Sequence, residues 1–447
     1  MASIHSSGLV IAVGTYDGVL AGWELNEEKE KNTSSANFRP LTLTFATSVH
    51  EGSVRSLCIA GSGTMGEPGA LLSCGYDETL KTHDWNKRQT SSGEVRTPSG
   101  FGTPICSAFA PPTGHSTHCV VGFSGDGKIC IYKKRDWSVQ HVLAGHDGGL
   151  GALAVHPTGK MALSGGVTDG KLKLWDLTKG RLSFVNKIAP VSTRNGRTRY
   201  DPITSVIWSE RGDFYAFSHD VHITVREVAT GKALLDVELP SRVNQVALMS
   251  GSEGLFVVAA CNDGSLPVLA VEDNEDESRK AIMAIEPVDS HLAREERFKC
   301  IQCIRDYHVV TANSAGVVSL MNLQGAINMM MSESEPLDEK RPSGSDASEE
   351  QEEDDKEDTE LAVDIVDSVR LGTGARITCL AAWCKKNNVT NQTARENKPT
   401  TLNEPTYKRK LESKADEYMN ADAVKKARSL VKKAKKLKRK KEKKIKK

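Results

Sequence analysis

The stretch that decides the fold is Met161–Asp176, with the sequence MALSGGVTDGKLKLWD. It reads as two short apolar strands joined by a turn that carries Asp169-Gly170. Asp and Gly suit such a turn because both tolerate left-handed backbone angles, and an Asp side chain can bond the amides that follow it. The stretch therefore predicts a β-hairpin that ends in Trp175-Asp176.

The same pattern recurs along the chain. Clear copies lie at Val10–Trp23, Leu71–Asp84 and Cys119–Tyr132, and weaker copies lie at Phe214–Val228, Leu255–Leu269 and His308–Leu323. Each unit also has a further alternating apolar segment, and these are Val54–Ala60, Ile105–Pro111, Leu150–His156, Ile203–Ser209, Val243–Met249, Cys300–Arg305 and Arg376–Trp383. Fourth segments such as Leu41–Val49, Val139–Ala144, Ala233–Leu239 and Ala362–Val369 complete the units.

Four strands per unit, with turn positions 43 to 60 residues apart, are typical of a β-propeller. The first unit lacks its innermost strand, and Arg376–Trp383 follows the seventh hairpin without a unit of its own. Pairing of Arg376–Trp383 with the strand near Val10 would close the ring and remove an exposed sheet edge. The sequence therefore predicts an all-β, seven-bladed propeller whose two chain ends share one blade.

The best copy carries Gly145-His146, Ser164, Asp169-Gly170 and Trp175-Asp176, and with these residues the chain resembles a WD-repeat protein. The resemblance implies a hydrogen-bonded chain within the blade through His146, Ser164, Asp169 and Trp175. The second copy keeps His50, Ser73 and Asp77 but has His83 where the Trp belongs. Ser164 lies one residue farther from its Asp than Ser73 does from Asp77.

Composition excludes several classes of protein. The chain has 447 residues, 38% of them hydrophobic, and a formal net charge of +1. No early segment has the pattern of a secretory signal, and no apolar run is long enough to span a bilayer, so we expect no membrane partner. Ten cysteines without such a signal indicate free thiols in a reducing compartment.

Three motifs raise the question of catalysis. His146, Ser164 and Asp169 are the residue types of a nucleophilic triad, but the repeat geometry would bury the serine without an oxyanion hole. Cys300-Ile-Gln-Cys303 has no second ligand pair at matching spacing, and on a strand its two thiols would point to opposite faces. Gly61–Gly66 matches GxGxxG without the strand–helix context of a dinucleotide site. We therefore expect no catalytic residue, metal or cofactor, and no enzyme.

Charge divides the chain into regions. Glu333–Glu360 holds 14 acidic and 3 basic residues, and Lys408–Lys447 holds 19 basic and 5 acidic ones. The expected organisation is a propeller over 1–331, a disordered acidic insert over 332–360, the closing strands over 361–384, and a linker with a Lys-rich amphipathic helical tail over 385–447. The insert is a solvated spacer, an acidic decoy for basic partners, or a segment phosphorylated at Ser343, Ser345 and Ser348.

The tail is the candidate binding segment. Its cations are densest at Lys432, Lys433, Lys435, Lys436, Lys438, Arg439, Lys440, Lys441, Lys443 and Lys444. Lysines without interleaved aromatics favour contact with phosphates rather than with bases, which predicts binding to RNA or a ribonucleoprotein together with nuclear targeting. The alternative is a tail that serves only solubility or targeting.

Several motifs in order resemble one branch of the WD-repeat proteins, the p21-activated kinase-interacting protein 1-like family. They are Gly14–Gly18, His50–Arg55, Ser73–Thr79, and Ala144–His146 with His156–Gly159, followed by the acidic insert and the lysine-rich end.

This resemblance implies a non-catalytic scaffold of the nucleus and nucleolus, a monomer within a complex. Such a scaffold assists 60S large-subunit assembly and pre-rRNA maturation by placing assembly factors on pre-60S particles, with rRNA contact through the tail. The alternative is a binding adaptor that negatively regulates a p21-activated kinase. A third reading, an enzyme built on a propeller, would need acids or metal ligands around the axis.

Overall fold

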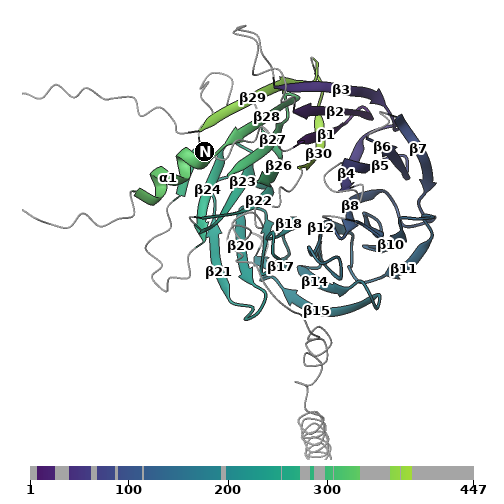
Figure 1. The fold of residues 1–447 in the computed structure, drawn as a ribbon. Coiled ribbons are helices and arrows are strands. Elements are labelled where there is room, and N and C mark those ends of the chain that lie inside the picture. The colour runs from purple at the N-terminus through teal and green to yellow at the C-terminus, as the bar shows by residue number, and fades with distance from the viewer. Residues whose placement is uncertain are drawn as a thin grey trace, which may run out of the picture. The chain divides into compact units, whose positions relative to one another are not determined.

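The computed structural model describes residues 8–25, 40–61, 68–85, 89–112, 115–192, 198–252, 254–271, 282–285, 297–305, 307–332, 363–372 and 374–384. These residues form seven four-stranded antiparallel sheets, which lie around a common axis as the blades of a propeller (Figure 1). The predicted fold class is therefore confirmed.

The blades follow one another along the chain. Blade 1 contains β1 (Val10–Thr15), β2 (Val19–Leu25), β3 (Leu41–Ser48) and β30 (Ile377–Trp383). Blade 2 contains β4 (Val54–Gly61), β5 (Pro68–Gly75), β6 (Thr79–Asp84) and β7 (Gln89–Arg96), and blade 3 contains β8 (Pro104–Ala110), β9 (His118–Phe123), β10 (Ile129–Lys133) and β11 (Val139–Leu143). Blade 4 contains β12 (Leu150–Val155), β13 (Met161–Gly166), β14 (Lys171–Asp176) and β15 (Arg181–Lys187).

The remaining blades repeat this order. A two-stranded ribbon of β16 (Val191–Ser192) and β17 (Thr198–Arg199) leads to blade 5, with β18 (Ile203–Trp208), β19 (Phe214–His219), β20 (His222–Glu227) and β21 (Ala233–Glu238). Blade 6 contains β22 (Val243–Gly251), β23 (Gly254–Cys261), β24 (Leu266–Val271) and β25 (Ile282–Ile285). Blade 7 contains β26 (Phe298–Arg305), β27 (His308–Asn313), β28 (Val317–Asn322) and β29 (Asp364–Arg370).

The core lies between neighbouring blades. In blade 3 the two faces of β9 and β10 pack on different neighbours. Val120 and Ile129 lie in a cluster with Leu150 and Trp175 of blade 4, and Val121 and Cys130 lie in a cluster with Leu72 and Leu80 of blade 2. Burial on both faces explains why these strands read as near-continuous apolar runs in the sequence.

The ring closes through the two ends of the propeller. β30 pairs antiparallel with β1, with Val10 opposite Trp383 and Ala12 opposite Ala381, and Figure 1 shows the purple β1 beside the yellow-green β30. The predicted closing strand is thus confirmed. Thr378 of β30 also donates a hydrogen bond to the carbonyl of Val54 on the next inner strand, 2.5 Å away.

Every innermost strand has an irregularity at its second residue. The ladder to the neighbouring strand skips this position in all seven blades, at Arg55, Ile105, Gly151, Thr204, Asn244, Lys299 and Thr378. A bulge of this kind bends the strand and aims the unpaired side chain away from the regular alternation.

One helix was not anticipated from the sequence. α1 (Gln324–Ser332) follows β28, and Asn322 accepts a hydrogen bond from the Gln324 amide at its start. Its residues Ala326, Ile327 and Met330 are buried in the cluster between blades 6 and 7. Beyond Ser332, the acidic insert up to residue 360 lies outside the described residues, as does the segment 385–447. No helix among the described residues is long and apolar enough to cross a membrane.

Two truncated chains should distinguish the contribution of β30 to stability from that of the tail. A chain that ends at residue 375 loses β30 and leaves the buried β1 with an open edge, so its free energy of unfolding should fall by about 5 kcal/mol or more, at about 1.5–3 kcal/mol for each large buried side chain. A chain that ends at residue 387 keeps β30 and should unfold like the full-length protein. Thermal unfolding followed by circular dichroism compares the two, and equal stability would contradict closure by β30.

Candidate functional site

The predicted chain of polar residues in blade 4 is brought together by three elements. His146 lies just before β12, Ser164 lies on β13, and Trp175 lies on β14. His146 Nδ1 lies 3.0 Å from Asp169 Oδ2, and its Nε2 lies 2.7 Å from Ser164 Oγ. The Trp175 indole N–H donates to Ser164 Oγ across 2.7 Å. The extra residue between Ser164 and Asp169 therefore does not keep Ser164 out of the network.

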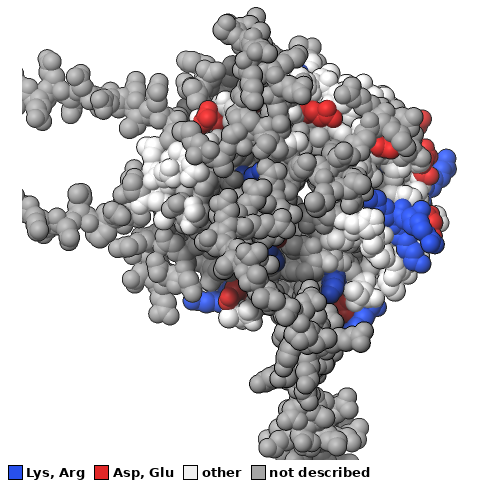
Figure 2. All heavy atoms as spheres, viewed as in Figure 1, with Lys and Arg blue, Asp and Glu red and all other residues white. Residues whose placement is uncertain are grey.

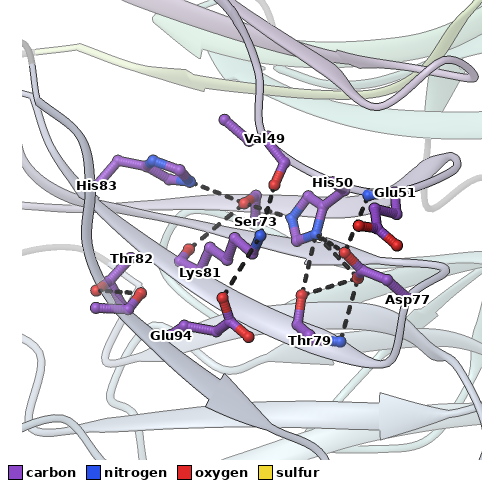
Figure 3. Close-up of polar contacts among 11 residues, drawn as sticks. Val49, His50, Glu51, Ser73, Asp77, Thr79, Lys81, Thr82, His83 and Glu94 are labelled. Atoms are coloured by element: carbon purple, nitrogen blue, oxygen red, sulfur yellow. Dashed lines mark hydrogen bonds and ion pairs between the residues drawn. The ribbon is translucent and has the colours of Figure 1, made fainter.

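Blade 2 has the same network with a different last member (Figure 3). His50 Nδ1 lies 3.0 Å from Asp77 Oδ1, and its Nε2 lies 2.8 Å from Ser73 Oγ. The His83 Nε2 atom lies 2.8 Å from Ser73 Oγ, in the place that Trp175 takes in blade 4. An imidazole N–H can donate as an indole N–H does, so the replacement preserves the bond to Ser73.

The bonding pattern assigns the protons. If the histidine Nδ1–H donates to the aspartate, its Nε2 accepts from the serine hydroxyl, and the serine oxygen then accepts from Trp175 or His83. Each imidazole nitrogen of His50 and His146 and each serine hydroxyl then has a partner within the blade. Burial of such groups costs little only when they are satisfied in this way.

Two lysines that the sequence motifs did not single out lie beside the same networks. Lys81 lies opposite Ser73 and Lys173 lies opposite Ser164 in the strand ladders. Lys81 Nζ donates to the carbonyl of Val49 across 2.7 Å, whereas Lys173 Nζ lies 3.7 Å from the Asp169 carboxylate. The signal was a shared spacing, since in KTHD and KLWD the lysine stands two residues before the member that bonds the serine.

Burial sets the charge state of the two histidines. It lowers the pKa of His50 and of His146, and the nearby carboxylates Asp77 and Asp169 only partly oppose this effect. Burial disfavours the ionised form of Asp77 as well, but hydrogen bonds from Thr79 and His50 outweigh it and lower the pKa of that carboxyl. The networks therefore hold neutral histidines near pH 7, and in blade 2 the partner Asp77 is ionised.

This geometry opposes nucleophilic catalysis at the His–Ser–Asp sets. Ser73 and Ser164 are both 0% exposed, and each serine oxygen already accepts a hydrogen bond from a third residue. A substrate carbonyl cannot reach either oxygen without opening the blade. The arrangement ties the loop before the inner strand to the hairpin of the same blade.

The cysteines follow the burial expected of core residues. Cys300 is buried in the cluster between blades 7 and 1, and Cys303 packs on the cluster between blades 6 and 7, so the two thiols face opposite sides of β26. All ten cysteines are free. Within the described ranges, no group of His, Cys, Asp or Glu could hold a metal ion.

Charged side chains are interspersed on the face shown in Figure 2, where the largest basic group lies around β10 and β11 with acidic side chains beside it. Lys133 ends β10, and Lys134, Arg135 and Asp136 follow in the turn to β11, where Arg135 lies 3.6 Å from Asp136. The predicted tail residues, from Lys432 to Lys444, lie outside the described residues.

The fold and the two networks define a WD-repeat β-propeller protein, and a family model for the WD domain, G-beta repeat, matches residues 137–176. Within this class the chain is similar to the p21-activated protein kinase-interacting protein 1-like protein of Xenopus laevis, at 25% identity over 83% of this chain and 81% of the relative. It is 26% identical to the Shk1 kinase-binding protein 15 of Schizosaccharomyces pombe over 70% of this chain and 77% of the relative.

A third relative is protein MAK11 of Saccharomyces cerevisiae, at 23% identity over 51% of this chain and 53% of the relative. These similarities confirm the resemblance to the p21-activated kinase-interacting protein 1-like proteins.

Removal of one hydroxyl should measure the blade 4 network. In Ser164→Ala the Trp175 N–H loses its acceptor and His146 loses its donor, so the free energy of unfolding should fall by about 1–3 kcal/mol. Ser73→Ala should act in the same way in blade 2, and Ser138→Ala, at an exposed turn, serves as the control. The measurement is urea denaturation. If Ser164→Ala unfolds at the same urea concentration as the wild type, the network does not stabilise the blade.

Stability should depend on pH through the same histidines. Because the folded pKa values of His50 and His146 lie below those of the unfolded chain, the unfolded state binds more protons below about pH 6.5, and stability falls as the pH falls. The urea midpoint should therefore drop between pH 7 and pH 5. In a His50→Asn/His146→Asn variant the urea midpoint should change less with pH. The change that remains comes from His219, because burial lowers its pKa as well. An unchanged slope would disprove the assignment.

Proposed function

We propose that this protein is a non-catalytic scaffold of nucleolar ribosome biogenesis. It assists 60S large-subunit assembly and pre-rRNA maturation by placing assembly factors on pre-60S particles. The observation that carries the proposal is the combination of a closed propeller with a dense run of lysines at Lys432–Lys444. The ordered motifs from Gly14 to Gly159 support it, through the branch of WD-repeat proteins that they resemble.

The polar networks favour a binding role over catalysis. The most reactive residue types of the propeller, His50 and His146 with their serines, are used to hold loops in place. Burial raises the pKa of the Cys106 and Cys379 thiols to about 12, which makes them poor nucleophiles. A propeller with locked loops is a rigid support on which partner surfaces can be arranged.

The tail supplies the contact with RNA in this proposal. The ten cations from Lys432 to Lys444 can neutralise phosphates and release counterions, a contribution to binding that is independent of sequence and falls steeply with salt. Nuclear and nucleolar targeting through the same segment accords with its composition. Tethering by the tail would keep factors bound to the propeller close to rRNA.

The second candidate function is that of an adaptor that negatively regulates a p21-activated kinase. The names of the Xenopus laevis and Schizosaccharomyces pombe relatives favour it, since both are named for binding a kinase. In that role the propeller alone would inhibit the kinase in a purified assay, and deletion of residues 388–447 would leave inhibition unchanged.

Substitution of the tail cations tests the ribosomal role. With Lys432, Lys433, Lys435, Lys436, Lys438, Lys440, Lys441, Lys443 and Lys444 changed to Gln, binding to an rRNA fragment should fall by about 100-fold or more at low salt, and the slope of log K against log salt should flatten. The matched control changes the same residues to Arg, which keeps the charge and should keep binding. If the Gln variant binds pre-60S particles and enters the nucleolus like wild type, the tail has no such role.

A further inference from the structure

Five cationic side chains lie where four neighbouring blades begin. Each directly precedes an innermost strand or stands second in it, on β22, β26, β30 and β4 in turn. We call this group the cationic arc, and its members are Arg242, Arg297, Lys299, Arg376 and Arg55. The blades that complete the ring begin with uncharged residues at the same two positions, namely Thr103 and Ile105, Gly149 and Gly151, and Pro202 and Thr204.

The arc lies on one face of the propeller. The backbone carbonyls of Arg376, Arg242 and Arg297 accept hydrogen bonds from the amides of Tyr16, Asn262 and Ser314, at 2.9, 2.9 and 2.8 Å. Each of these amides belongs to the turn between the second and third strands of its blade. The face that carries these turns, which we call the turn face, therefore also carries the arc.

Arg55 places the arc close to the axis. It stands on an innermost strand at a bulge position and is nevertheless exposed. Burial raises the pKa of Cys106 on β8 and of Cys379 on β30, and the Arg55 charge opposes the rise in both. Because β8 and β30 flank β4 on its two sides, the guanidinium lies near the inner strands of three blades.

The arc is not neutralised within the part of the chain that the structure describes. Lysines elsewhere on the propeller have carboxylate neighbours, as Lys128 has Asp126 at 2.8 Å and Lys81 has Glu94 at 3.6 Å. Among the described residues, no carboxylate lies within ion-pair distance of any member of the arc. Like charges that share one region repel, so a ligand of opposite charge would gain affinity there.

The surroundings of the arc narrow the choice of ligand. The same face also carries exposed acids, with Asp17, Glu78 and Asp263 in its turns and Glu51 in the loop before β4. Beside them Tyr16 and Tyr76 are 60% and 64% exposed. A uniformly charged polyanion such as RNA would place phosphates beside these acids, whereas a peptide can place carboxylates on the arc and uncharged side chains beside the acids.

We infer that the turn face binds an acidic peptide segment of a partner protein, with its carboxylates on Arg55, Lys299 and the neighbouring arginines and its apolar side chains on Tyr16 and Tyr76. Arginine and tyrosine are the residues that most often dominate protein–protein contacts, and guanidinium groups can bind carboxylates through two parallel bonds. The inference rests on the proposed scaffold role and gives it a partner chemistry. Its test uses a purified protein and a synthetic peptide, so it can fail while the ribosomal role stands.

The test measures binding of a fluorescent glutamate-rich peptide of about 12 residues that contains two phenylalanines. In Arg55→Glu/Lys299→Glu the dissociation constant in the full-length protein should rise at least about tenfold. The matched control, Lys133→Glu/Arg135→Glu, reverses two cations at the opposite end of a blade and should bind like wild type. A lysine-for-glutamate version of the peptide should bind the Arg55→Glu/Lys299→Glu variant better than it binds wild type.

Four outcomes of these binding measurements would overturn the inference. They are an unbound peptide in wild type, an unchanged affinity in Arg55→Glu/Lys299→Glu, an equal loss in the control variant, and an equal fold loss for a single-stranded oligonucleotide of the same charge. If thermal unfolding shows that Arg55→Glu/Lys299→Glu does not fold, Arg242→Ala/Arg376→Ala replaces it, because both residues lie outside the strands. The same outcomes then decide.

The chain's own acidic segment is the competing occupant. Deletion of residues 338–358 should leave the peptide affinity of the full-length protein unchanged within about twofold if the arc is open to a partner. A gain of about fivefold or more would show that the acidic segment occupies the arc, and would overturn the assignment to a partner protein.

Discussion

The pairing of β30 with β1 is the constraint on which the rest of the propeller depends. It joins residues more than 360 positions apart in the sequence and leaves no blade with an open inner edge. Side chains of the inner strands add bonds between blades around the axis. The Gln302 amide bonds both the N–H and the carbonyl of Ala382, and Thr204 donates to Val243. The Trp208 indole N–H of blade 5 likewise donates a hydrogen bond to the carbonyl of Ala154 in blade 4. Closure therefore makes each blade interface depend on the others.

Within this ring the buried polar networks are unevenly distributed. Blades 2 and 4 keep the full set of histidine, serine and aspartate, whereas other turns use their polar residue only locally, as Asp263 does with Ser265 and Asn313 with the amides of Ala315 and Val317. Local bonds stabilise a turn, but only the full network links that turn to the loop before the inner strand. Such blades should resist local opening more than the rest, because more bonds must break together.

The same architecture separates stability from recognition. The histidines and serines of the two networks are buried and hydrogen-bonded within their blades. They therefore stabilise the blades and offer no free polar group to a ligand. Positions at the bulges of the inner strands are free of the ladder, and the chain uses them in two ways. Thr204, Asn244 and Thr378 bond the next blade, whereas Arg55 and Lys299 present charge near the axis. The bulge at the second residue of the inner strands thus provides hydrogen bonds between blades at some positions and exposed charge at others.

The sequence by itself determined the number of blades and the closing strand, because strand alternation and Asp-Gly turns are local signals that repeat. The residues of both networks followed from the resemblance of these repeats to WD-repeat proteins. It could not show that His83 takes the role of a tryptophan, or that Lys81 and Lys173 lie opposite the serines, since these depend on ladder register. α1 was missed because its burial depends on the cluster between blades 6 and 7, which only the packed fold assembles. The cationic arc was decided by the tertiary structure alone, since only ring closure brings Arg55 beside a strand that begins at Ile377.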